Sequence, residues 1–475
     1  MIQIDHSLEP EALRDGVEAV FTQAAPKLRS LHSTWDLQKG APVYTLAGGY
    51  ATRGWTEWTQ GFMYGMPLYL FDATGEQEFL DLGREGTRTV MASHVSHIGV
   101  HDHGFNNIST YGNLLRLMSE GRIRENFWER EFYRLALKVS GAVQAARWTP
   151  LPDELGFIHT FNGPHSLFAD TIRTLRVLAA AHELGHVLMG ESDERISLLR
   201  RLLQHAESTA RWNVYYGNGR DGWDLRGRVV HESIFNVRNG AYRCPSSQQG
   251  YSPFTTWTRG HSWVLLGFAE QLEYFYERLE NEDVAAQHLP FYPDLATAEE
   301  RFRETACAAA DFYLEHTPAD GITYWDTGAP NLHRLGDYLN RPADPFNEWE
   351  PVDSSAAAIS AQGLLRLGRY LQQRGDTERG RRYEKAGLTT ARSLMAQPYL
   401  SFDPEHQGLL LHTIYHYPNR WDRVQPGQRV PNGESCMWGD YHLLELAVYL
   451  QRLMDGRPYL AFYRGTKRED GDGNG

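Results

Sequence analysis

Two kinds of helical segment alternate along this chain. Segments of the first kind are apolar and follow a short run of polar, aromatic or glycine residues; they begin near Trp58, Asp102, Asp170, Arg259, Asp353 and Asp440. Segments of the second kind carry many charges and one apolar stripe, as an amphipathic helix packed on a core does. They cover roughly residues 9–31, 76–94, 125–147, 191–214, 297–315 and 376–396. The strict alternation predicts an all-α fold, an (α/α)6 barrel of six inner and six outer helices.

The alternation continues without a break, so we expect one catalytic barrel domain over residues 1–464. Two stretches, 215–257 and 326–352, are rich in Gly, Pro, Asn and Arg, which predicts long loops rather than helices. Long loops at one end of a rigid barrel are where a site would be enclosed. The last residues, 465–475, have the polar, glycine-rich composition of a disordered tail.

Composition restricts the partners. The formal net charge of −13 argues against a nucleic-acid or anionic-membrane surface, since both need a basic field. An anionic substrate stays possible, because one or two local Arg or His residues suffice to bind it. The 13 Trp and 25 Tyr residues indicate either stacking surfaces for sugar rings or a large aromatic core. Oligomeric state cannot be predicted from these features.

The sequence favours a cytoplasmic location. Residues 1–30 contain five acids and no continuous apolar core, unlike a secretory signal. No stretch reaches the ~20 apolar residues of a membrane span. Three widely spaced cysteines fit a reducing compartment. An exported chain that has lost its leader is the alternative.

Polar residues converge if the inner helices all point their N-termini toward one end of the barrel. Trp58, Asp102, Asp170, Arg259 and Trp263 would then meet there, from four different helices. Trp58 is either a core residue or a surface on which a sugar ring stacks. The convergence predicts a pocket with two acids, which suggests acid/base chemistry on a neutral or anionic ligand.

The two aspartates have different settings. Asp102 stands where a helix N-cap would, so a purely structural role is open. Asp170 is followed by Thr171, Ile172 and Leu175 on an apolar helix, where a carboxylate must be paired, hydrogen-bonded or protonated. Desolvation there would raise its pKa, which suits a general acid near neutral pH.

Four histidines near Asp102 suggest a metal site at first sight: His94, His97, His101 and His103. His101 and His103 are two residues apart, however, and would point away from each other in a helix or a strand. No HExxH motif includes these four histidines, and no Cys pair lies beside them. A phosphate loop and a nucleotide fingerprint are also absent. We therefore expect no metal and no organic cofactor.

Arg259 lies at the start of the fourth inner helix, after Gln248 and Gln249. A guanidinium and amides at a helix N-terminus can bind a sugar carboxylate. A structural ion pair with one of the many acids explains Arg259 equally well. His231, taken alone, is typical of a loop or core histidine.

Several ordered motifs resemble glycoside hydrolase family 88, the unsaturated glucuronyl hydrolases, whose fold is an (α/α)6 barrel. The resemblance runs from about Trp55 to Leu450. It depends on Trp58-Thr-Gln-Gly-Phe62, His101-Asp102-x-Gly-Phe105, the Asp170 segment, Gln249-Gly-Tyr251, Thr258-Arg-Gly-x-x-Trp263, Gly321-x-x-Tyr-Trp-Asp326, Asp353-Ser-Ser-Ala-Ala357 and Trp438-Gly-Asp-Tyr441.

The resemblance implies roles for individual residues. The aspartate matching Asp170 is the family's general acid and base, and the one matching Asp102 is its necessary partner beside the substrate. The positions matching the remaining candidates line the sugar pocket: Trp58, His231, Gln249, Arg259 and Trp263. We add His101 to them, because His101 or His103 would keep Asp102 anionic.

The chain departs from the family pattern in three ways. Gln248 replaces a common histidine, Thr174 stands where an asparagine is usual, and the loop from Asp326 to Asp353 is longer. These changes put the substrate specificity in doubt more than the chemistry.

The implied reaction removes a Δ4,5-unsaturated uronic acid from the non-reducing end of lyase-generated oligosaccharides. Asp170 would protonate C4 of the vinyl ether and then take a proton from the water that adds at C5. Asp102 would hold the pKa of Asp170 up by like-charge repulsion. The alternatives are an inverting glycosidase, a sugar epimerase with His231 as base, and a non-catalytic oligosaccharide-binding protein.

Overall fold

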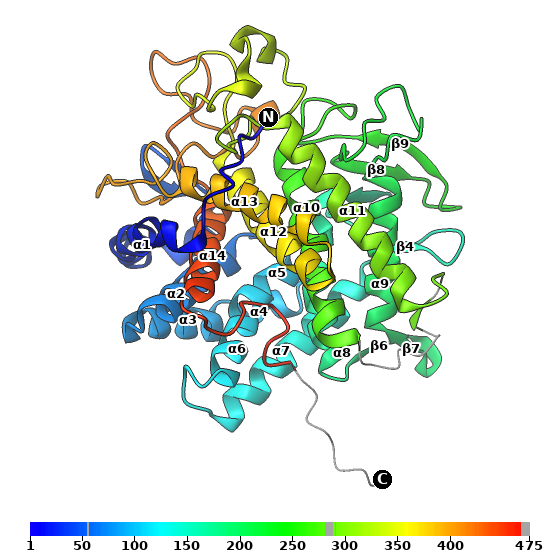
Figure 1. The fold of residues 1–475 in the computed structure, drawn as a ribbon. Coiled ribbons are helices and arrows are strands. Elements are labelled where there is room, and N and C mark those ends of the chain that lie inside the picture. The colour runs from blue at the N-terminus through cyan, green and yellow to red at the C-terminus, as the bar shows by residue number, and fades with distance from the viewer. Residues whose placement is uncertain (55–56, 281–287, 290, 467–475) are drawn as a thin grey trace.

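The computed structural model describes residues 1–54, 57–280, 288–289 and 291–466. Its helices form two concentric rings (Figure 1). The inner ring comprises α2 (Gln60–Thr74), α5 with α6 (His103–Asn107 and Asn113–Ser119), α8 (Leu175–Glu183), α10 (Thr258–Tyr274), α12 (Ser354–Gln373) and α14 (Met437–Met454). One π-helical turn, Ile108–Gly112, joins α5 to α6 into a continuous helix.

The outer ring follows the amphipathic segments that the sequence predicts. Its members are α1 (Arg14–Thr34), α3 (Gln77–Thr89), α7 (Phe127–Ala146), α9 (Leu198–Trp212), α11 (Leu295–His316) and α13 (Thr377–Leu394). A short helix, α4 (Ala92–Val95), follows α3. Each outer helix packs against the inner helix next to it in sequence, and α1 packs against both α14 and α2.

The inner helices close into a ring. α2 contacts α5, α5 contacts α8, the turn before α8 contacts α10, α10 contacts α12, α12 contacts α14, and α14 returns to α2. The alternation of apolar and amphipathic segments therefore predicted the (α/α)6 barrel correctly.

Short strands lie in the loops between the helices. The sequence analysis predicted only helices and loops and did not include them. They are β1 (Tyr44–Leu46), β2 (Gly49–Ala51), β3 (Trp148–Pro150), β4 (Gly156–Ile158), β5 (Ser166–Phe168), β6 (Val187–Met189), β7 (Arg195–Ser197), β8 (Glu232–Phe235) and β9 (Tyr242–Ser246). Strands β5, β8 and β9 form one antiparallel sheet, and the others pair as two-stranded hairpins. The stretches 215–257 and 326–352 contain no α-helix, as expected, although β8 and β9 lie in the first.

Close packing of the inner ring depends on small residues. A Cβ on Gly61 of α2 would lie 2.5 Å from the Cα of Asn106 on α5. The backbone N–H of Gly61 donates instead to the Asn106 side-chain oxygen at 2.9 Å. The two inner helices thus approach backbone to backbone, because glycine leaves room for it.

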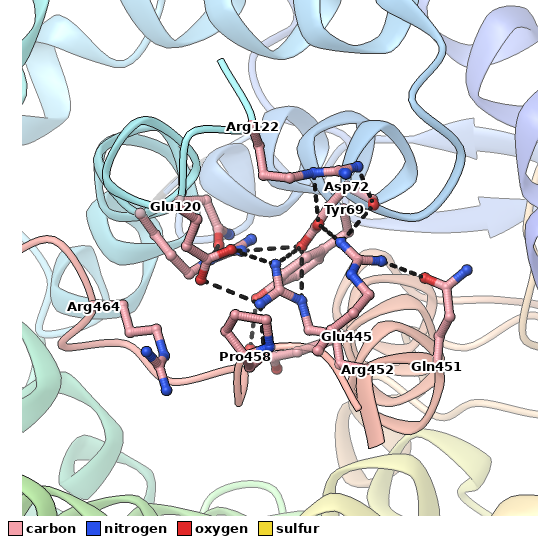
Figure 2. A network of polar contacts seen from close by, with 12 residues as sticks. Tyr69, Asp72, Glu120, Arg122, Glu445, Gln451, Arg452, Pro458 and Arg464 are labelled. Carbon is pink, nitrogen blue, oxygen red and sulfur yellow. Dashed lines mark hydrogen bonds and ion pairs between the residues drawn. The ribbon is translucent and has the colours of Figure 1, made fainter. Parts of the chain in front are cut away.

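The C-terminal ends of the inner helices meet in a charged cluster around Asp72 (Figure 2). The carboxylate is fully buried and pairs with Arg116 at 3.0 Å, Arg452 at 2.6 Å and Arg457 at 2.8 Å. Glu120 also pairs with Arg452 at 2.6 Å. Burial acts to raise the pKa of Asp72, but the three arginines outweigh it and lower the pKa.

The chain after α14 covers this end of the barrel. Leu460, Ala461 and Tyr463 are buried there, and the backbone oxygen of Leu460 accepts a hydrogen bond from Arg366 of α12. Thr466 is also buried, so the beginning of the predicted disordered tail is part of the fold. The rest of that tail, residues 467–475, lies outside the described residues. Among the helices described, none has the length and apolar character that crossing a membrane requires.

Replacing Asp72 tests how much the cluster contributes. Asp72→Ala removes the anion shared by the buried Arg116 and Arg452 and the partly exposed Arg457. We therefore expect a loss of about 3–5 kcal/mol in the free energy of unfolding. Asp81→Ala on the exposed surface of α3 is the matched control, with an expected change within about 0.5 kcal/mol. Urea unfolding followed by far-ultraviolet circular dichroism measures both. Equal midpoints for the two variants would contradict the role given to Asp72.

Candidate active site

The N-terminal ends of the inner helices surround a cavity of about 250 Å³. Its lining comprises Trp58, His101, Asp102, Phe105, Phe161, Phe168, Asp170, Gln248, Gln249, Trp257, Arg259, Trp263, Tyr415, His416, Asn419 and Trp421. Seven of the eight site residues expected from the sequence are among these, and His231 lies directly behind the lining. The expected convergence of helix starts is therefore present in the structure.

The two aspartates enter the cavity from the starts of neighbouring inner helices. Asp102 immediately precedes α5, but its side chain makes no capping hydrogen bond to the helix. The structural explanation for Asp102, an N-cap, is thus not supported. Asp170 lies in a 3-10 turn, Ala169–Thr174, between β5 and α8. It is therefore not on the apolar helix, as the sequence suggested, but on the strand-to-helix turn before it.

One imidazole nitrogen lies close to both carboxylates. His101 Nε2 is 3.4 Å from Asp170 Oδ1 and 3.7 Å from Asp102 Oδ1. The hydroxyl of Thr174 donates to the backbone oxygen of His101 and fixes its position. A Cβ on Gly104 would lie 2.7 Å from the backbone oxygen of Thr174, so this close approach requires glycine. Of the two histidines considered as partners of Asp102, His101 is the one in contact.

The pKa shifts of Asp102 and Asp170 differ from those that the sequence predicted. Burial raises the pKa of Asp102 to about 6, with a further contribution from the charge of Asp170. Burial also acts to raise the pKa of Asp170, but the contact with His101 and the charges of His231 and Arg259 outweigh it and lower the pKa. Burial would lower the pKa of His101, yet the two aspartates raise it.

The sequence predicted a raised pKa for Asp170 and an anionic Asp102, and both predictions are wrong for the free protein. The physical reason is the position of the cations. His101 is nearer to Asp170 than to Asp102, and Asp170 also faces His231 and Arg259. In the free protein Asp102 holds a proton up to a higher pH than Asp170 does.

His231 stands behind the lining with a defined hydrogen-bonding state. Its Nδ1 accepts from the backbone N–H of Gln248 at 3.1 Å, and its ring packs on Phe168 and Trp257. Burial lowers its pKa to about 4, so the ring is neutral near pH 7. With Nδ1 accepting, the proton is on Nε2, which is buried without a hydrogen-bond partner. His231 is therefore a donor on this side, not a base.

Arg259 both pairs with an acid and lines the cavity. Its guanidinium forms a buried ion pair with Asp353 at 2.8 Å and donates to the backbone oxygen of Tyr415 at 2.6 Å. It also donates to Gln249 Oε1 at 2.8 Å, which orients that amide toward the cavity lining. The structural ion pair that the sequence left open is therefore present, and Arg259 lines the cavity as well. Arg259 contributes a fixed positive charge and positions Gln249.

Aromatic rings form much of the remaining surface. Trp58 stacks on Trp438, with ring centroids 4.8 Å apart and an interplanar angle of 29°. Trp263 stacks on Phe105, with centroids 6.0 Å apart and an angle of 11°. Flat apolar faces next to carboxylates and amides are suited to binding a sugar ring.

The neighbouring histidines form a separate cluster. His103 Nε2 lies 2.5 Å from His97 Nδ1, and its ring meets that of His94 edge to face. Nearby cations and burial keep the pKa of His103 well below its ordinary value. Within the described part of the chain, no group of three or more His, Cys, Asp or Glu residues is arranged to hold a metal ion.

Several lining residues escaped the sequence analysis. Phe161 and the segment 415–421 lie on loops, whereas the search relied on the starts of helices. The aromatic-rich string from Tyr415 to Trp421 was the available signal. Arg147, at the end of α7, was also missed although its charge acts on Asp102.

Comparison with known proteins agrees with this geometry. No family model matches the chain. An unsaturated glucuronyl hydrolase from Bacillus sp. strain GL1 is 27% identical over 418 residues, which are 85% of this chain and 89% of the relative. The crystal structure of an unsaturated glucuronyl hydrolase from Bacillus sp. GL1, responsible for the degradation of glycosaminoglycan, matches with a TM-score of 0.66 at 23% identity, over 95% of this chain and 99% of that one.

A second solved structure contains an unsaturated glucuronyl hydrolase variant with dGlcA-Glc-Rha-Glc. It matches with a TM-score of 0.66 at 23% identity, over 96% of this chain and all of that one (100%). The chain is thus similar to the unsaturated glucuronyl hydrolases over most of its length, and the resemblance indicated by its motifs is confirmed. The solved structures also share its helical-barrel fold.

The raised pKa of Asp102 has a consequence for stability. A carboxyl group whose pKa rises on folding from 3.8 to about 6 favours the folded state less as pH increases through that window. Above pH 6 the cost is on the order of 2–3 kcal/mol. We therefore expect Asp102→Asn to unfold at higher urea concentration than the wild type at pH 7.5, and the difference to vanish near pH 4. A variant less stable than the wild type at pH 7.5 would contradict the direction of the shift.

Proposed function

We propose that this protein is a glycoside hydrolase that removes a Δ4,5-unsaturated uronic acid from the non-reducing end of lyase-generated oligosaccharides. The observation that carries the proposal is the pair of aspartates that both face His101 Nε2 in an aromatic cavity. The similarity to unsaturated glucuronyl hydrolases supports the same reaction. The substrate partner is then an unsaturated uronic-acid oligosaccharide.

The reaction needs a proton donor and a base at one position. Asp170, the general acid, protonates C4 of the C4=C5 double bond and leaves an oxocarbenium ion shared by C5 and the ring oxygen. Water adds at C5 and gives its proton to the Asp170 carboxylate. The C5–O bond of the resulting hemiketal then breaks, and the hemiacetal at C1 releases the leaving sugar. Since nothing attacks the anomeric carbon, the carboxylate-separation rule for glycosidases does not apply.

Substrate binding raises the pKa of Asp170, so that this residue can hold the proton it donates. In the free protein, contact with His101 and the charges of His231 and Arg259 lower the pKa of Asp170. A uronate carboxylate bound near His101 and Arg259 would neutralise part of their field and repel the Asp170 carboxylate. Both effects raise the pKa of Asp170, so the proton held by Asp102 in the free protein can pass to Asp170 through His101.

The roles of the other site residues follow from their contacts. Gln249, oriented by Arg259, is a donor for the sugar oxygens. His231 contributes to binding from behind the lining, where its Nδ1 accepts from the backbone N–H of Gln248. Trp58 and Trp263 are the stacking surfaces for the ring. This division needs neither a metal nor an organic cofactor.

The competing functions fit the site less well. A sugar epimerase with His231 as base needs an unprotonated ring nitrogen facing the cavity, but Nδ1 accepts from the backbone N–H of Gln248. A protein that only binds sugar has no need of a carboxyl pair that burial and coupling shift in opposite directions. An inverting glycosidase remains the alternative, and saturated uronides distinguish it.

We extend the proposal to the organisation and location of the protein. Residues 1–464 form one catalytic domain, since the inner ring draws helices from the whole chain between residues 60 and 454. A cytoplasmic location is supported by three unpaired cysteines, Cys244, Cys307 and Cys436.

An absorbance assay tests the proposed reaction. The conjugated double bond of an unsaturated disaccharide absorbs in the near ultraviolet, and its hydration removes that absorbance. We expect loss with the wild type and a rate at least about 100-fold lower with Asp170→Asn, since the proton donor is gone. Asp320→Asn is the matched control: Asp320 also has its pKa raised to about 6 by burial, but it lies outside the cavity. Hydrolysis of saturated uronides without loss of absorbance would favour the inverting glycosidase.

The pH dependence tests the shared proton. If the active form holds one proton on the aspartate pair, log(kcat/KM) falls with unit slope above pH about 6, the pKa of Asp102 in the free protein. Asp102→Asn removes this titration, so its alkaline limb moves away from pH 6 while turnover drops. A profile with the same limb in wild type and Asp102→Asn would refute the assignment.

A further inference from the structure

The outer helix α7 has an apolar stripe on the side that faces away from the barrel. Trp128 is 79% exposed, Phe132 39% and Leu135 58%, and Val139 and Val143 are partly exposed. Their spacing of 4, 3, 4 and 4 residues keeps them on one face of the helix over about 22 Å.

The opposite face of α7 already packs on the barrel. Tyr133, Ala136, Leu137, Gly141 and Ala145 are buried there. An outer helix needs only that one apolar face, and its other face is ordinarily polar. The stripe is therefore an addition that the barrel itself does not explain. Contiguous exposed apolar surface of this kind marks an interaction site.

The sizes of the side chains along the stripe allow two copies of it to pair in opposite directions. Large rings, Trp128 and Phe132, lie at its N-terminal end, and the small Val139 and Val143 lie at its C-terminal end. If two copies of α7 pair antiparallel about an axis near Leu135, Trp128 meets the partner's Val143 and Phe132 meets the partner's Val139. A two-fold interface has this property, since residue i contacts j and j contacts i.

The charges beside the stripe match the same arrangement. Glu131 and Lys138 flank it on one side, four residues before and three residues after Leu135. In the antiparallel pair Glu131 faces the partner's Lys138, and Lys138 faces the partner's Glu131. A parallel two-fold pair would place this flank of the two copies on opposite sides of the seam, so neither charge would face its counterpart. Charge and side-chain size thus select one orientation and one register.

We propose that α7 is the interface of a homodimer of this protein, in which two α7 helices pair antiparallel around Leu135. The occupant of the stripe is a second copy of the chain. Leu135 lies at the centre of the interface, and the rings of Trp128 and Phe132 lie toward its two ends. Aromatic residues are enriched at such surfaces, and two symmetry-related Glu131–Lys138 pairs border this one. The proposal does not depend on the function proposed above.

Sedimentation velocity over a range of protein concentrations tests the dimer. We expect a reversible monomer–dimer equilibrium for the wild type. Leu135→Glu places two carboxylates against each other at the axis, so the dimer Kd should rise at least about 100-fold. Val237→Glu is the matched control, because Val237 is similarly exposed, at 60%, in the loop between β8 and β9. Circular dichroism verifies that each variant is folded.

Charge reversal tests the register. Glu131→Lys and Lys138→Glu each replace two attractions by two repulsions, so each should raise the dimer Kd roughly tenfold. The double variant restores opposite charges across the axis and should return the Kd to near that of the wild type. Failure of the double variant to recover would overturn the antiparallel register.

Three other outcomes would overturn the proposal. One is a wild type that stays monomeric at every concentration. Another is a dimer that persists in Leu135→Glu or is equally weakened in Val237→Glu, since the interface would then be elsewhere or nonspecific. The third is sedimentation of the monomer with phosphatidylcholine–phosphatidylserine vesicles that Trp128→Ala abolishes, which would assign the stripe to a lipid surface.

Discussion

The common direction of the six inner helices is the constraint on which the rest of the structure depends. Because all of them begin at the same end of the barrel, unpaired backbone N–H groups and the positive ends of the helix dipoles gather around one cavity. An anionic ligand is favoured there, although burial still raises the pKa of Asp102 to about 6. At the other end the carbonyl groups gather, and arginines such as Arg116 and Arg452 lie among them with their own acids. The barrel thus separates a reactive end from a structural end.

Within the reactive end, His101 makes two carboxyl groups act as one unit. Either aspartate alone would be an ordinary buried acid with a raised pKa. With one imidazole nitrogen close to both of them, the free energy of one proton depends on the charge of both, and on every cation that faces either. Ligand charge can therefore change where the proton resides without any movement of the backbone. This property follows from the contacts of three side chains, and the aromatic lining keeps the field strong by excluding water.

The sequence predicted the barrel well because helical periodicity reports which face of a segment is buried, and twelve such segments gave mutually consistent results. It also predicted the meeting of Asp102, Asp170 and Arg259, since each stands at the start of an inner helix. The sequence did not predict the features that depend on contacts between residues far apart in the chain. The pKa order of the aspartates depends on how far each lies from His101, and Phe161 reaches the cavity from a loop that has no periodicity. The sequence allowed an ion pair for Arg259 but did not identify its partner, because Asp353 is 94 residues away.

The position of Asp72 in the chain has a consequence for how the molecule assembles. Its carboxylate lies in the first inner helix, but Arg452, which binds it, follows 380 residues later. Until that arginine arrives, closing the base of the barrel would bury an anion without most of its partners, which is costly. The ring of inner helices is therefore expected to stay open during nearly all of the synthesis of the chain. The barrel closes only when the final segment, which carries Arg452, is available. Until closure, the apolar faces of the early helices stay exposed, and exposed apolar surface makes a chain prone to aggregate.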